Sequence, residues 1–303
     1  MKSVIFCLAF LVGSFAPRLM ASPDYSKVGP YSIEKLKLGG PIKGQIALPK
    51  AMTGPLPIII LGHGFASYPR YHMGWAEHLA SYGFAAVAIS LCEAPICAPD
   101  PKKAAAQIQA ALAYLQSEEA PIELRNRLDF NHIGLQGHSA GGQGFAMASE
   151  VIRPEALVLL DPVSGGSPID RDISVPLASL PKICAPVMTL YAEGDGLSGT
   201  CNKNSLWSTV PVLPAGESFS AKVSGSTHCN GESPMRALCG PFCAVLPSKK
   251  YEATYKDYIA SWFLAHMKQD PEAMARLQQE NVLMDDRVRD QKFSTGSGCF
   301  SSN

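Results

Sequence analysis

The sequence predicts an α/β protein whose central sheet is mostly parallel and is covered by helices on both faces. Short apolar runs bounded by prolines and glycines, such as 56–61 (LPIIIL) and 84–90 (FAAVAIS), are typical of strands buried on both faces. Helical patterns stand between these runs, and strands that alternate with helices form a parallel sheet. The two observations together define the class.

The elements follow in that alternating order. The pattern around Gly39 and Gly40, over residues 31–49, predicts a hairpin at the edge of the sheet. Helices are predicted at 74–82, 102–118 and 141–151, and an amphipathic helix at 251–267. Further strands are predicted at 131–136, 156–161, 186–195 and 218–228.

Composition limits the domain organisation and the partners. The chain has 303 residues, and its 26 basic residues equal its 26 acidic ones, so it lacks the basic excess that nucleic-acid binding requires. No internal repeat or long linker divides it. We predict a single domain over residues 22–303, with a polar, loosely packed tail at 269–303.

The first residues resemble an export signal. Lys2 precedes an apolar run from Val4 to Ala16, and small residues follow at Ala21 and Ser22. A positive start, a short apolar core and a small-residue cleavage site predict a signal peptide at 1–21 and a secreted or periplasmic protein. The run is short for a membrane span, which is the alternative, and no span is predicted after the signal is removed.

The cysteines agree with export. Cys7 lies in the predicted signal, and the other eight form an even number, which suits disulfides in an oxidising compartment. Cys92 and Cys97 enclose the shortest plausible loop and are the predicted pair. The alternative is a zinc site, with these candidate ligands: His228, Cys229, Cys239 and Cys243. Because paired C-x₂-C knuckles are absent, we predict no metal.

One serine stands in a candidate nucleophile motif. Gly137, Ser139 and Gly141 form G-x-S-x-G, which composition alone supplies in about one chain in ten of this length. Here a predicted buried strand precedes the motif and a helix pattern follows it. A sharp strand-to-helix turn exposes the serine, and the two glycines relieve its crowding. The context favours a nucleophile over a serine in an ordinary turn.

A serine hydroxyl needs a base, and the base needs a carboxylate to orient it. At this kind of turn the acid and then the histidine follow the serine along the chain. His228 ends the last predicted strand and is the candidate base, whereas His266 lies in the terminal helix. Asp161 and Asp195 each follow a strand, and both strand ends meet the same edge of the sheet. Either aspartate satisfies this geometry.

A second loop supplies candidate oxyanion donors. The segment 61–65 (LGHGF) follows the first buried strand, and its glycine allows a close backbone approach. The N–H groups of Phe65 and Ala140 are predicted to stabilise a developing oxyanion. His63 is expected to hold this loop by hydrogen bonding. The predicted chemistry requires no cofactor.

At these residues the chain resembles the α/β-hydrolase superfamily, and within it the chlorophyllase-like and platelet-activating-factor-acetylhydrolase-like esterases. The motifs are LGHGF, WAEHLASYGFAAVA, GLQGHSAGG and VLLDPVSG, over roughly 56–165. The resemblance implies an ester hydrolase without a cofactor. In this branch the acid follows the strand after the nucleophile helix, which here is Asp161. The expected protein is a secreted serine esterase with Ser139, His228 and Asp161 as its triad, acting through an acyl-enzyme.

Two motifs are also similar to secreted cutinase-like polyester hydrolases. HLASYGF and TLYAEGD carry this likeness, and there the acid comes one strand later, at Asp195. Chlorophyllases carry an arginine after the nucleophile, where this chain has Ala140. An interfacial lipase or polyester hydrolase that uses Asp195 is therefore the alternative enzyme. A non-catalytic binding protein on the same fold is the alternative from another class.

Overall fold

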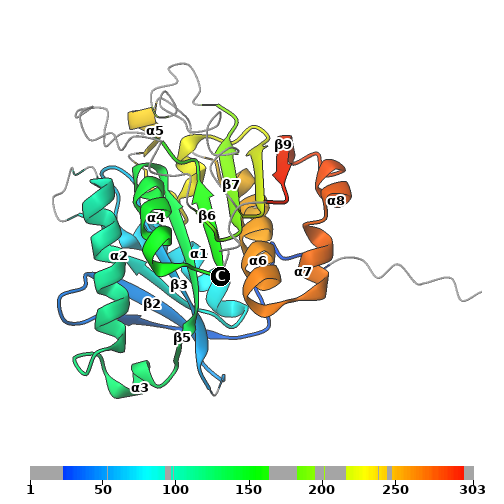
Figure 1. The fold of residues 1–303 in the computed structure, drawn as a ribbon. Helices are drawn as coiled ribbons and strands as arrows, with labels where there is room; N and C mark the ends of the chain where they lie inside the picture. Colours follow the sequence, from blue (N-terminus) through cyan, green and yellow to red (C-terminus); the bar gives the residue numbers. More distant parts are fainter. Residues whose placement is uncertain are drawn as a thin grey trace, which may run out of the picture.

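The structure, a computed structural model, describes residues 23–52, 54–92, 97, 99–163, 183–194, 201, 216–237, 239–243 and 248–296. The predicted signal peptide at 1–21 and the alternative acid, Asp195, lie outside this part of the chain. The described residues include a sheet of nine strands in the order β1-β2-β4-β3-β5-β6-β7-β8-β9 (Figure 1). Its strands are β1 (Ile33–Lys37), β2 (Gly44–Pro49), β3 (Leu56–Gly62), β4 (Ala85–Ile89), β5 (Leu128–His138), β6 (Ala156–Leu160), β7 (Val187–Ala192), β8 (Ser218–Val223) and β9 (Val288–Ser294).

The middle of the sheet is parallel, as the sequence predicts. Strands β4, β3, β5, β6, β7 and β8 pair in parallel, so their carboxyl ends meet at one edge. The predicted hairpin is β1 and β2, which pair antiparallel at one side. At the other side β9 pairs antiparallel with β8. Both sides of the sheet thus end in antiparallel strands, and the candidate residues Ser139 and Asp161 follow strands of the parallel centre.

Helices cover both faces of the sheet (Figure 1). On one face lie α2 (Pro101–Gln116) and α4 (Ser139–Ile152), and on the other lie α1 (Met73–Ser81) and α6 (Glu252–Lys268). The shorter helices are α3 (Ile122–Arg125), α5 (Cys239–Cys243), α7 (Pro271–Arg276), α8 (Gln279–Leu283) and the 3₁₀ turns η1 (Pro69–Tyr71), η4 (His228–Gly231) and η5 (Lys249–Tyr251). The helix that starts at Pro101 is capped by Asp100, whose carboxylate accepts a hydrogen bond from the Lys103 N–H at 2.8 Å.

The core forms two layers separated by the sheet. Along β3, Ile58 and Ile60 pack towards α2 and α4, whereas Ile59 and Leu61 pack towards α1 and α6. All four side chains are fully buried. Successive side chains of a strand point to opposite faces, so a strand covered on both sides needs a continuous apolar run. This explains the run at 56–61.

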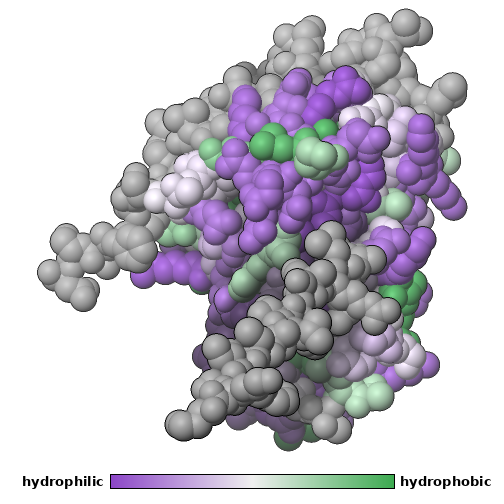
Figure 2. Space-filling view, turned by 90° about the vertical axis from the view of Figure 1, so that its right-hand side faces the viewer, coloured by the Kyte–Doolittle hydropathy of each residue, from purple (hydrophilic) through white to green (hydrophobic). Residues whose placement is uncertain are grey.

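The C-terminal segment corrects two expectations. Residues 269–303 are predicted to pack loosely, but 271–294 form α7, α8 and β9 on the side of the molecule shown in Figure 2. Arg276 and Arg287 both bind Asp257 and Asp285, and Phe293 stacks on Phe219 with ring centroids 5.1 Å apart. The helix at 252–268 is not amphipathic, since most of its residues are buried.

The surface on this side is mostly hydrophilic, with hydrophobic residues in small separate groups (Figure 2). Among the helices that the structure describes, none combines the length and the apolar sequence needed to cross a bilayer.

Candidate active site

Ser139 lies at the junction between β5 and α4. The strand ends at His138 and the helix begins at Ser139, whose φ of 54° is in the left-handed region. A side chain at Gly137 would place its Cβ 2.8 Å from the Cα of Gly142, and one at Gly141 would overlap the carbonyl of His63. Both glycines of the motif are therefore required by close packing around a sharp turn. The turn holds Ser139 at the carboxyl edge of the sheet.

Three side chains form a continuous hydrogen-bonded row at this edge. The Ser139 hydroxyl donates to Nε2 of His228, with Oγ and Nε2 2.8 Å apart. The other ring nitrogen, Nδ1, donates to Oδ2 of Asp161 at 2.6 Å. All three residues are at most 5% exposed. A buried carboxylate in this position holds the imidazole so that Nε2 accepts the serine proton.

The backbone fixes Asp161 as well. Its φ is 42°, and its N–H donates to the carbonyl of Leu190 on β7 at 2.7 Å. Its second carboxylate oxygen, Oδ1, accepts from the Ala192 N–H at 3.2 Å. One carboxylate oxygen of Asp161 therefore accepts a hydrogen bond from β7, and the other accepts one from His228.

His228 opens the 3₁₀ turn η4, which is held from several directions. Thr227 and Asn230 form a reciprocal cap, with the Thr227 N–H 2.9 Å from Oδ1 of Asn230. The indole of Trp75 donates to the carbonyl of Gly231 at 2.9 Å. A disulfide links Cys229, the residue after His228, to Cys239. These contacts restrict the position of the imidazole.

The loop after β3 packs directly against Ser139. A Cβ at Gly64 would lie 2.5 Å from the Cβ of Ser139, so the backbone approaches as closely as glycine permits. His63 holds this loop, as the sequence predicts: its Nδ1 donates to the Gly64 carbonyl at 2.9 Å, and its Nε2 accepts from the Leu91 N–H at 3.0 Å. Burial lowers the pKa of His63 to about 4, so the ring is neutral near pH 7.

The far end of this loop is also fixed. Ala66 has a φ of 48°, and its N–H donates to the carbonyl of Cys97 at 2.8 Å. Cys97 forms a disulfide with Cys92, which confirms the predicted pair. Cys201 pairs with Cys243, and Cys184 is disulfide-bonded as well.

Four polar residues near the row are not identified by the sequence analysis. Glu232 and Arg236 follow His228, and Ser67 donates to Glu232 at 2.6 Å between Oγ and Oε1. His138 lies directly before the nucleophile, and its Nε2 donates to the backbone carbonyl of His228 at 3.1 Å. Glu232 and Arg236 are oppositely charged and stand four residues apart between Cys229 and Cys239, which is the one signal in the sequence.

The described residues contain two groups with metal-ligand atoms close together. Cys229, Cys239 and Cys243 form one group, but all three sulfurs are in disulfides, which overturns the zinc alternative. His72, His138 and Glu232 form the other, with donor atoms within 4.8 Å of one another. There the carboxylate of Glu232 already accepts from Ser67 and from Arg236. The cysteine sulfurs, being disulfide-bonded, are not available as metal ligands.

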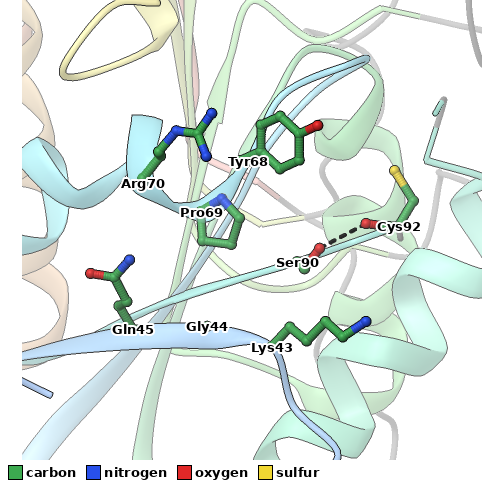
Figure 3. A pocket seen from close by; sticks show the side chains of 8 residues that line it. All are labelled: Lys43, Gly44, Gln45, Tyr68, Pro69, Arg70, Ser90 and Cys92. Carbon is green, nitrogen blue, oxygen red and sulfur yellow. Dashed lines mark hydrogen bonds between the residues drawn. The ribbon is translucent and has the colours of Figure 1, made fainter. Parts of the chain in front are cut away.

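A cavity of about 250 Å³ opens close to the loop after β3 (Figure 3). It is lined by residues 43–45 at the start of β2, 68–70 at η1, and Ser90 and Cys92 after β4. The guanidinium of Arg70 stacks on Tyr68, 4.6 Å from its ring centroid. Neither Ser139 nor His228 nor Asp161 is among its lining residues. The cavity adjoins the candidate site without containing it.

Comparison with known families decides the relationship. The sequence model of the Chlorophyllase family matches residues 26–223, a span that includes Ser139 and Asp161 and ends before His228. The chain belongs to the chlorophyllase family. The fold expected from the resemblance, that of the α/β-hydrolases, is therefore confirmed by the sheet, the helices and the family match together.

Curated relatives of this family member are ester hydrolases by name. It is 28% identical over 178 residues to bis(hydroxyethyl) terephthalate hydrolase of Streptomyces coelicolor, covering 56% of this chain and 52% of that protein. It is 26% identical over 222 residues to chlorophyllase-2 of Arabidopsis thaliana, covering 69% and 67%. It is 31% identical over 140 residues to cutinase est2 of Thermobifida alba, covering 40% and 45%. The chain thus spans about half the length of the first and third of these relatives.

Proposed function

We propose that the protein is a carboxylic ester hydrolase with Ser139, His228 and Asp161 as its catalytic triad. The buried row from Ser139 Oγ through both nitrogens of His228 to Asp161 carries this proposal, with distances of 2.8 and 2.6 Å. Membership of the chlorophyllase family and the names of the relatives support the reaction class. The proposed acid is Asp161 because it contacts His228.

In the proposed reaction, Ser139 Oγ attacks the ester carbonyl carbon while His228 Nε2 takes the hydroxyl proton. The carbonyl oxygen becomes an oxyanion, which the N–H groups of Phe65 and Ala140 stabilise. The carbon–oxygen bond to the alcohol then breaks, and the alcohol takes the proton from His228. Water attacks the acyl-enzyme, His228 accepts its proton and returns it to Ser139, and the acid leaves.

The substrate of the proposed enzyme is a small-molecule or polymeric ester. Relatives named for bis(hydroxyethyl) terephthalate and for cutin favour a second candidate, a polyester hydrolase acting at an interface. The disulfides favour an oxidising compartment, consistent with a secreted or periplasmic enzyme. Release of soluble products from a polyester film, compared with the hydrolysis of soluble esters of increasing acyl length, distinguishes the two substrate classes.

Covalent labelling tests the triad. A fluorophosphonate should label the folded protein at Ser139, as peptide mapping can show, and should not label the Ser139→Ala variant. Asp161→Asn should lower kcat by about 10⁴-fold, the loss typical of a triad carboxylate, and Asp195→Asn is the matched control. An unlabelled folded protein would support the non-catalytic alternative, and a loss confined to Asp195→Asn would overturn Asp161 as the acid.

A further inference from the structure

Two buried charged residues, Glu232 and Arg236, contact the loop that carries Phe65. The side chains of Arg236 and Glu232 are 9% and 1% exposed. The guanidinium of Arg236 reaches two consecutive backbone carbonyls of this loop: Nη2 donates to the Phe65 carbonyl at 3.3 Å, and Nη1 donates to the Ala66 carbonyl. One rigid, planar donor therefore holds two successive peptide groups.

Glu232 connects this guanidinium to the same loop by a second route. Its Oε1 lies 3.3 Å from Nε of Arg236, and its Oε2 accepts from the Arg236 backbone N–H at 3.1 Å. Oε1 also accepts from the hydroxyl of Ser67, the residue after Ala66, at 2.6 Å. The segment 65–67 is thus attached at both ends to one buried ion pair, whose members lie four and eight residues beyond His228 in the chain.

We propose that Arg236 is a positioning residue for the oxyanion hole and that Glu232 orients its guanidinium. This inference rests on the proposed function. Removing two charges from water costs several kcal/mol per ion, so a buried ion pair is a poor means of stabilising a fold. Here the pair holds a loop whose Ala66 has a φ of 48° and whose Phe65 N–H is the proposed donor. Donors that are fixed before the oxyanion forms stabilise it most.

Three variants test the role of Arg236. Arg236→Met removes the guanidinium, Arg236→Lys keeps one cationic donor, and Arg276→Met is the matched control. Arg276 is 10% exposed and pairs with two aspartates on the C-terminal side, where no proposed catalytic residue lies. For each variant, kcat and KM are measured on a soluble chromogenic ester, together with the Ki of a boronic acid that forms a tetrahedral anion on Ser139. Near-UV circular dichroism and Tm report folding.

Arg236→Met should lower kcat by about 100-fold, the lower range for an oxyanion donor, while KM changes by less than about threefold. The boronic acid should bind more weakly in proportion to the loss in kcat, and Arg236→Lys should recover part of both. Arg276→Met should lower Tm and leave kcat unchanged. If Arg236→Met does not fold, Arg236→Lys and Glu232→Gln carry the same test.

Two results would overturn the inference: a folded Arg236 variant with wild-type kcat, or a loss of kcat with unchanged boronic-acid affinity. Failure of the proposed function is a separate observation, because it would appear in the wild-type protein as absent ester hydrolysis and absent labelling at Ser139.

Discussion

Lowering the pH from 7.5 to 5.5 should remove a large part of the protein's stability. Three buried histidines and the partly buried His266 have a depressed pKa: burial lowers the pKa of His63, His78 and His266 to about 4, and that of His72 to about 3. In the unfolded chain their pKa is about 6.5. Between these values the unfolded state binds more protons than the folded state, so stability falls as the pH falls.

The magnitude follows from the unfolded chain. Between pH 7.5 and 5.5 an unfolded histidine with a pKa of about 6.5 gains about 1.4 kcal/mol from protonation, while a folded one with a pKa of about 4 gains almost nothing. Four such residues together lower the free energy of unfolding by about 5 kcal/mol, whereas the typical free energy of unfolding of a protein is about 5–15 kcal/mol. Burial also lowers the pKa of His138, which adds to the loss. Burial raises the pKa of Glu217 and Glu232, which act in the opposite direction.

Urea unfolding at the two pH values, followed by tryptophan fluorescence with the disulfides intact, measures the difference. His266→Gln is the sharpest variant, because His266 packs on Trp262 with ring centroids 4.2 Å apart and is not part of the proposed site. Its loss should reduce the pH-dependent difference in unfolding free energy by about 1.4 kcal/mol. Met267→Leu, in the same helix, should leave that difference unchanged. An equal pH dependence in His266→Gln and wild type would refute the argument.

Two further predictions concern the loop after β3. Gly64→Ala should lower kcat by about 100-fold, because its Cβ would lie 2.5 Å from the Cβ of Ser139. Gly194→Ala, where the new Cβ meets no atom of the described residues within 4 Å, should not lower it. Equal kcat in the two variants would contradict the packing described. Replacing both Cys92 and Cys97 by serine should lower kcat by about 2- to 10-fold, the range for one hydrogen bond, because the Cys97 carbonyl holds the Ala66 N–H. Unchanged kcat in that double variant would show that the disulfide does not fix the loop.

Local patterns predict the centre of this fold well. A strand buried on both faces needs a continuous apolar run, and a turn that presents a nucleophile needs small residues within five positions of it. Both features depend only on residues that are close in the sequence, so the positions of β3, β4 and the turn at Ser139 can be predicted from the sequence. His228 can be predicted as the candidate base by elimination, because only His228 and His266 follow Asp161 in the chain.

The remaining parts depend on contacts between distant residues. The carbonyl of Ala66 and the guanidinium of Arg236 are 170 positions apart, and no local pattern connects them. The C-terminal segment misleads for a related reason. Arg276, Arg287 and Asp285 give it a polar sequence typical of a solvent-exposed tail, yet in the structure the two arginines pair with Asp285 and with Asp257 of α6. Hydrogen bonds from Arg287 outweigh the opposing effect of burial and lower the pKa of Asp285 to about 2. A polar composition therefore does not by itself predict that a segment packs loosely.

Backbone strain explains why the distant anchors are needed. In the described part of the chain six non-glycine residues have a positive φ, and three of them, Ala66, Ser139 and Asp161, lie in the candidate site. Each such conformation costs about 1–3 kcal/mol and persists only where the surroundings hold it. Asp161 is held by Leu190 and Ala192, and Ala66 is held by Cys97 on one side and Arg236 on the other. Buried hydrogen bonds to the backbone should therefore concentrate where the strain is. Arg236 has a buried guanidinium that binds the backbone carbonyls of Phe65 and Ala66. On this reasoning its role is to hold the loop of the candidate active site and not to stabilise the core as a whole.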